Sequence, residues 1–185
     1  MSHNRNLRDR LVSYFLPEPL TERGGIDLRR AELTVKTVLI LIVWGPVFAA
    51  VYYFGLGSTL GAGLAAASTV TSGLALFLMR WTGRPTVAGN VYNVSLTITF
   101  VGLTMITGGL DAPGLWWLTV IPLFALLFTG FRSSVTWLVV TLLLVGAIYA
   151  ADTMGVEFRH SLTPGQRDFL IVAGLMGLVA TVFTI

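Results

Sequence analysis

The chain has 185 residues, of which 55% are hydrophobic and only 11% are charged. Soluble domains carry about 25% charged residues, so this composition excludes a water-soluble globular fold and predicts an all-α integral membrane domain. The absence of cysteine excludes disulfides and thiolate metal sites. The net charge of +3 does not indicate nucleic-acid binding, because the basic residues cluster where membrane topology places them.

Residues 1–34 form a polar, basic segment that lacks the apolar core of a signal peptide. Four apolar side chains in it follow a helical spacing: Leu7, Leu11, Tyr14 and Phe15. This spacing predicts a short amphipathic helix in the inner headgroup region, ended by Pro17. A partly ordered basic tail that only sets topology is an equally good interpretation. Residues 27–36 are then expected to form a charged helical lead into the membrane.

Residues 35–185 are predicted to form one transmembrane domain of six helices. A helical span needs about 20 mostly apolar residues. Six runs meet this need, over residues 37–56, 59–79, 86–107, 115–131, 133–151 and 168–185. No charged residue lies inside any run, and the alternation of a membrane β-barrel is absent. Pro46 and Pro122 are expected to kink the first and fourth spans.

The distribution of Lys and Arg predicts the orientation. With the N-terminus in the cytoplasm, ten of the twelve basic residues fall on the inner side, and only Arg159 and Arg167 fall outside. The positive-inside rule therefore predicts an N-in/C-in domain in the bacterial inner membrane. The last run reaches Ile185 without an interfacial anchor, so we expect the natural chain to continue into a cytoplasmic output domain.

The third span carries polar side chains at intervals of three and four residues. Together with one phenylalanine they form a single stripe: Asn90, Asn93, Thr97, Phe100, Thr104 and Thr107. Amide and hydroxyl groups prefer a bundle interior to lipid, so we expect this helix to be central. The stripe has two interpretations that the sequence leaves open. It could bond neighbouring helices together, or it could form the polar wall of a ligand pocket.

Small residues recur at four-residue spacing in the second span, as Gly57, Gly61 and Ala65 and as Gly63 and Ala67. Such faces let helix backbones approach closely. They favour tight packing inside the bundle, with the seam of a homodimer as the alternative.

Aromatic side chains collect at the predicted outer end. They either form an interfacial belt or contribute to a site for a small apolar or amphipathic ligand beside the Gly-rich turn. For the second interpretation the candidate ligand-binding residues are Asn93, Thr97, Thr104, Gly108, Gly109, Asp111, Pro113, Trp116, Trp117 and Tyr149. No catalytic or metal-binding constellation is found in the sequence.

The turn between the third and fourth spans reads TGGLDAP and is followed by two tryptophans and a proline. It resembles the six-span sensor region of bacterial histidine kinases, which also precedes some cyclase domains. RegB-type redox-sensing kinases carry a GGxxNPF motif at this turn that is associated with quinone binding. Gly108, Gly109 and Pro113 match that motif, while Ala112 replaces its Asn and Gly114 its Phe. The resemblance implies a dimeric signalling receptor with quinone as a candidate cofactor.

The leading hypothesis is therefore a membrane-embedded sensor that responds to a small apolar ligand or to membrane redox state. Its last helix would relay the signal to a histidine kinase or cyclase. Two alternatives stay open at this level. One is a small permease, and the other is an anchor that only dimerises a nucleotide cyclase.

Overall fold

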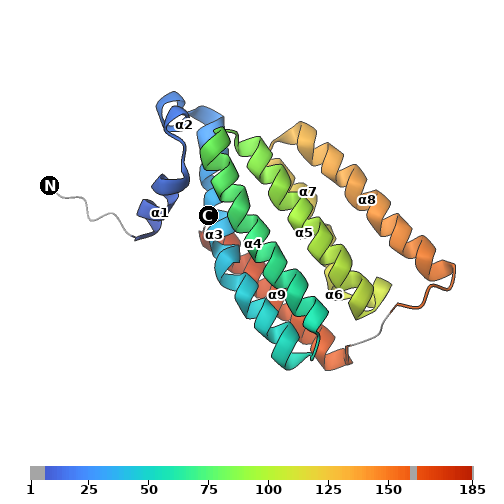
Figure 1. Cartoon of the computed structure of the whole chain (residues 1–185). Helices are drawn as coiled ribbons and strands as arrows, with labels where there is room; N and C mark the ends of the chain where they lie inside the picture. Colours follow the sequence, from blue (N-terminus) through green and yellow to red (C-terminus); the bar gives the residue numbers. More distant parts are fainter. Residues whose placement is uncertain (1–6, 159–161, 185) are drawn as a thin grey trace.

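A computed structural model describes residues 7–158 and 162–184. Within these ranges the secondary structure is entirely helical, and the long helices run side by side in one bundle (Figure 1). In chain order the elements are α1 (Leu7–Phe15), α2 (Glu18–Arg23), α3 (Gly25–Ala50), the π-helix η1 (Val51–Gly55), α4 (Thr59–Thr82), α5 (Pro85–Thr107), the 3-10 turn η2 (Gly109–Asp111), α6 (Pro113–Leu118), α7 (Ile121–Phe128), α8 (Phe131–Thr153) and α9 (Pro164–Thr184). The predicted all-α class is confirmed.

Four of the described helices are long and apolar enough to cross a membrane. They are Gly25–Gly55, α4, α5 and α8, and they coincide with the first, second, third and fifth predicted spans. The first helix begins at Gly25, well before the apolar run, so the predicted charged lead is helical. Its end widens into a π-helix, a local irregularity that hydropathy does not predict.

The fourth predicted span is two short helices rather than one kinked rod. The chain breaks between α6 and α7, where the amide of Val120 donates to the carbonyl of Trp117 at 3.2 Å in a tight i to i+3 turn. Pro122 occupies the first turn of α7, where its missing N–H costs nothing. The two helices together cover only residues 113–128, about 24 Å at 1.5 Å per residue, which is short of a full crossing.

The last helix, α9, begins at Pro164, four residues before the predicted start of the sixth run. It contacts α3 and α6, so the first and the last of the long helices are neighbours in the bundle (Figure 1). Ile185 lies outside the described residues, as does Arg159, whose predicted place on the outer side the structure does not address.

The polar third span is the central helix, as predicted. α5 contacts α3, α4, α6 and α7, and 44% of its most apolar stretch is buried, against 28% or less for the other three long helices. Its polar side chains therefore meet protein on several sides, and the structure shows which of them are bonded.

The N-terminal helix α1 packs across one end of the bundle against α3 and α4. Val12 is buried and Phe15 is half-buried, and the Phe15 ring meets Phe77 edge-on at 5.4 Å between centroids. Leu11 and Tyr14 instead point outward and are exposed. The predicted apolar stripe is thus divided between the bundle and the surroundings.

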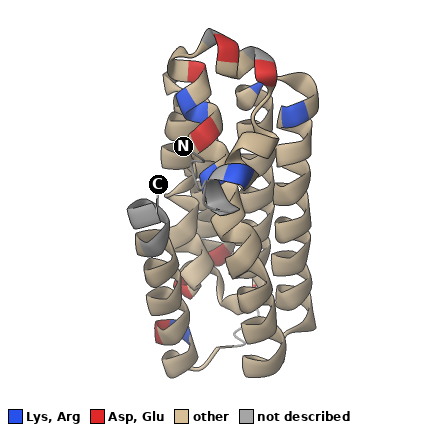
Figure 2. Cartoon of the chain, turned by 90° about the vertical axis from the view of Figure 1, so that its left-hand side faces the viewer, with Lys and Arg blue, Asp and Glu red and all other residues tan. Residues whose placement is uncertain are grey.

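Charge is concentrated at the end of the bundle that carries α1 and α2 (Figure 2). The guanidinium of Arg80 lies 4.1 Å from the Tyr14 ring centroid at this end, and it also donates to the Tyr14 carbonyl. Among the described residues of the opposite end, Arg167 is the one basic side chain, and it pairs with Asp111. The asymmetry used to predict orientation is therefore present in the folded chain.

Candidate functional site

A partly open cavity of about 160 Å³ lies between the helices and is lined by residues of α3, η1, α4, α5, α6, α7 and α9. Seven aromatic side chains line it, namely Trp44, Phe48, Tyr52, Tyr92, Phe100, Trp117 and Phe124. Hydroxyl groups are also present, from Thr37, Ser68, Thr69, Ser72 and Thr99. An apolar cavity of about 150 Å³ in a protein core can hold one benzene ring, so this cavity has the size of a single ring.

Glycines let the helices approach closely around this cavity. A Cβ on Gly45 of α3 would overlap the hydroxyl of Thr69 on α4. A Cβ on Gly114 of α6 would lie 2.7 Å from the Thr104 hydroxyl and 2.9 Å from the Phe100 carbonyl oxygen on α5. The helices approach closely at these two glycines, and aromatic side chains hold them further apart elsewhere. The cavity lies between the glycines and these aromatic rings.

Trp117 connects three helices at the cavity wall. Its indole lies 6.3 Å from the Phe100 ring between centroids, tilted by 33°. The other side of the indole fills the space beside Gly174 of α9, where a Cβ would overlap the ring. Trp117 therefore links the cavity wall to α9 by direct contact.

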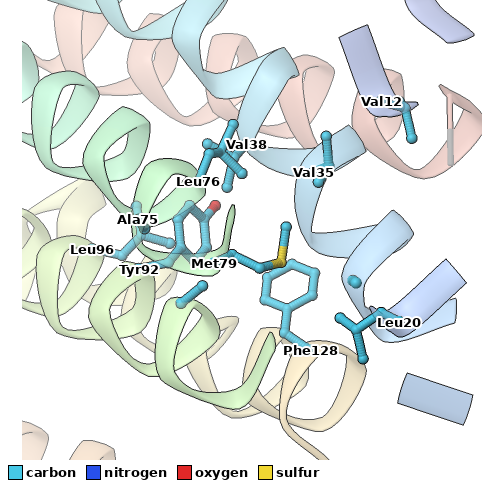
Figure 3. Packing of buried hydrophobic residues seen from close by; sticks show 12 residues of the cluster. Val12, Leu20, Val35, Val38, Ala75, Leu76, Met79, Tyr92, Leu96 and Phe128 are labelled. Carbon is cyan, nitrogen blue, oxygen red and sulfur yellow. The ribbon is translucent and has the colours of Figure 1, made fainter. Parts of the chain in front are cut away.

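Two buried hydroxyl groups of the cavity wall have no hydrogen-bond partner among the described residues. They belong to Thr37 on α3 and Tyr92 on α5, both fully buried. Other threonines of the bundle donate to the carbonyl four residues earlier, as Thr34 does to Arg30 at 2.8 Å and Thr99 to Ser95 at 2.9 Å. Figure 3 shows the Tyr92 ring extending from α5 into the cluster that α3 and α4 contribute, with its hydroxyl at the far end.

Part of the polar stripe on α5 is structural. The side-chain oxygen of Asn90 accepts hydrogen bonds from Trp137 Nε1 at 2.9 Å and from Ser133 at 3.0 Å, which joins α5 to α8. The hydroxyls of Thr97 and Thr107 donate to backbone carbonyls of α5 itself, at 2.7 and 2.6 Å. Asn90 thus joins two helices, as in the first of the two interpretations left open by the sequence, whereas the hydroxyls of Thr97 and Thr107 bond only within α5.

Two further residues of the stripe are buried without a hydrogen-bond partner in the described part of the chain. Both polar atoms of the Asn93 amide and the hydroxyl of Thr104 are in this state. Asn93 does not line the cavity, whereas Thr104 abuts Gly114, which does.

The candidate ligand-binding residues do not gather in one place. Pro113 and Trp117 line the cavity. Trp116 is 65% exposed and Tyr149 is 60% exposed, so both face the surroundings of the bundle. Asp111 is also exposed and pairs with Arg167 at 3.4 Å.

The two glycines of the turn have a packing role. Gly108 and Gly109 are buried, both with positive φ. A Cβ on Gly109 would overlap the ring of Phe158. The residues that match the quinone-associated motif thus shape the turn, and among them Pro113 reaches the cavity wall.

The cavity also depends on residues that the sequence did not single out as a site. Trp44 and Phe48 come from the first long helix, and Gly174 and Gly177 come from the last. A pair of glycines three residues apart in an apolar run is a usable signal of close approach, but it does not say which helix approaches.

No protein-family model, no curated protein and no solved structure matches this chain.

Proposed function

We propose that this chain is the signal-sensing membrane domain of a bacterial receptor, in which a small apolar or amphipathic ring binds the central cavity and shifts α9. One observation carries the proposal. Trp117 lines the cavity and at the same time packs directly on Gly174 of α9. Occupancy of the cavity is thereby linked to the position of the helix that would lead to an output domain.

The relay requires two packings of the bundle with different affinity for the ligand. Trp117 packs on the bare backbone of Gly174, so an indole displaced toward α9 would push on the helix backbone itself. We therefore expect α9 to move as a unit between the two packings. Couplings between two sites are typically about 1–3 kcal/mol. A ligand that moves the indole by forcing it against α9 would act in this range.

The proposed topology has six membrane crossings with the N-terminus and α9's end in the cytoplasm. The basic end of the bundle, with Arg80 and α1, supports this orientation. The broken pair α6–α7 serves as the fourth crossing, since irregular backbone at membrane depth is tolerated where protein or a cavity surrounds it. A dimeric histidine kinase or a cyclase following α9 fits this layout.

The test measures α9 directly. The chain has no cysteine, so spin labels can be placed on cysteines introduced at Val43 of α3 and Met176 of α9, which are both exposed. Acetophenone added to the chain in lipid nanodiscs is expected to change the inter-label distance distribution. Trp117→Ala should abolish the change and Trp116→Ala should leave it. An unchanged distribution in the wild type at saturating probe contradicts the proposal.

A small permease is the second candidate, because the broken helices α6 and α7 line the cavity through Gly114, Trp117 and Phe124. Transporters often build their substrate sites from such interrupted helices. Uptake of a panel of membrane-impermeant sugars and amino acids into proteoliposomes separates the two functions, since a sensor moves none of them.

A further inference from the structure

We infer that the cavity opens sideways into the hydrocarbon of the bilayer, beside Gly177 and between α9 and α7, and that its ligand enters there from the lipid phase. This inference rests on the proposed function and adds the route by which the ligand reaches the site. The cavity is partly open, and buried side chains close both of its ends, so the opening lies on a side of the bundle.

The end of the cavity that the proposed topology places outside is closed by one side chain from each of three elements. Tyr52 of η1, Leu103 of α5 and Leu170 of α9 form one buried cluster, and all three line the cavity. None of them is more than 7% exposed. The Tyr52 ring also packs against Gly61 on α4, where a Cβ would lie 2.5 Å from the ring. A molecule in the outer water therefore meets a packed layer before it meets the cavity.

The inner end is closed by a larger buried cluster. Tyr92 and Leu96 of α5 line the cavity and belong to this cluster. Leu76, Met79 and Phe128 continue it toward the charged end of the bundle (Figure 3), where α1 packs across α3 and α4. Side chains from α3, α4, α5 and α7 thus separate the cavity from water on this side as well.

The side wall is weakest between α9 and α7. In the described part of the chain, α9 packs beside α3 and α6 but not closely along α7, although Gly177 of α9 and Phe124 of α7 both line the cavity. A Cβ on Gly177 would meet no atom within 4 Å, so the wall has open space at this point. Phe124, Gly177 and Leu178 are half-buried, unlike the lining residues of the two ends. These three residues therefore mark the opening.

The depth and the surroundings of the opening place it in lipid. Gly177 lies nine residues after Asp168, the last charged residue of α9, which is about 14 Å at 1.5 Å per residue and close to half of a hydrocarbon core of about 30 Å. The neighbouring side chains Val172, Met176 and Val179 are apolar and exposed. A molecule that uses this opening must therefore first dissolve among the acyl chains.

Power-saturation EPR tests which phase the opening faces. A nitroxide is attached to the single cysteine of Gly177→Cys in lipid nanodiscs, because the chain has no cysteine of its own. Collisions with oxygen, which concentrates in lipid, should exceed collisions with a water-soluble nickel chelate. Gly146→Cys on α8 is the matched control, since Gly146 is exposed, has open space at its Cβ position and does not line the cavity. More collisions with the nickel chelate at Gly177 than at Gly146 would overturn the lateral opening.

A larger side chain at the same position tests the route. Gly177→Leu places an isobutyl group in the opening, so 4-fluoroacetophenone should enter and leave about tenfold more slowly at unchanged affinity. Exchange rates and the bound fraction are measured together by ¹⁹F exchange NMR on the chain in nanodiscs. Gly146→Leu should leave both quantities unchanged.

The outcomes separate the route from the function. Unchanged exchange in Gly177→Leu, a loss of affinity without slower dissociation, or equal slowing in Gly146→Leu overturns the opening at Gly177 and leaves the sensing cavity in place. Failure of the wild type to bind the probe overturns the proposed function and this inference with it. Size-exclusion chromatography and circular dichroism confirm that each variant is folded, and the EPR comparison decides the phase even where the leucine variant does not fold.

Discussion

Gly174 of α9 is the position at which a single methyl group should report on the proposed link between cavity and last helix. The Trp117 indole occupies the space where a Cβ would stand, with its Cε2 atom 2.6 Å from that point. Gly174→Ala therefore forces the indole or α9 to move. A rigid aromatic edge cannot yield in the way that the tip of a flexible side chain can.

The expected cost follows from this geometry. Overpacking of a filled core costs about 1–3 kcal/mol, and relief of the backbone entropy of glycine returns about 0.5–1 kcal/mol. Gly177 lies one turn further along the same helix, and a Cβ there meets nothing within 4 Å. Gly177→Ala is thus the matched control and should stabilise the domain slightly while Gly174→Ala destabilises it.

The measurement is SDS titration of the domain in detergent micelles, followed by near-ultraviolet circular dichroism. A double-mutant cycle with Trp117→Leu adds the decisive comparison, because the smaller side chain removes the clash. The combined effect of Gly174→Ala and Trp117→Leu should be less destabilising than the sum of the two by about 1 kcal/mol or more. Equal effects of alanine at Gly174 and Gly177, or strict additivity in the cycle, would refute the described contact.

Three further predictions concern other parts of the bundle. Asn90→Ala removes the acceptor shared by two donors of α8 and should cost about 1–3 kcal/mol in the same titration, more than Trp137→Phe, which removes one of the two donors. Asp111→Asn breaks an ion pair whose partners are both well exposed, so it should change stability by less than about 1 kcal/mol and leave acetophenone binding unaltered. Cysteines introduced at exposed Glu157 and Glu22 should differ in intact cells, with a membrane-impermeant maleimide labelling the first and not the second, and the reverse pattern would overturn the proposed orientation.

Helix positions were predictable because lipid offers the backbone N–H and C=O groups no hydrogen-bond partners, so these groups must bond within the segment. Apolar runs of sufficient length must be helical, and the starts of α4 and α5 match the predicted runs within a residue. The fourth run failed as a single helix because hydropathy measures composition, whereas continuity depends on whether each N–H finds its carbonyl. Pro122 breaks that continuity, and the sequence indicated the place but not its extent.

The neighbouring tryptophans show where sequence reasoning about the site stops. Side chains of adjacent residues on a helix point about 100° apart, so Trp116 and Trp117 could not both face the interior. Nothing in their local sequence says which one does. The structure decides it through partners from distant parts of the chain, the Phe100 ring on α5 and the bare backbone of Gly174 on α9.

The same dependence on distant partners explains why this cavity is suited to relay a signal. Its walls come from α3, near one end of the sequence, and from α9, near the other, so no local segment can close it alone. Gly45 of α3 and Gly174 of α9 belong to this wall, at points where a neighbouring side chain leaves no room for a Cβ. A molecule that fills the space contacts residues of α3, α5 and α9 at once. Its binding free energy can therefore shift α9 from one position to another.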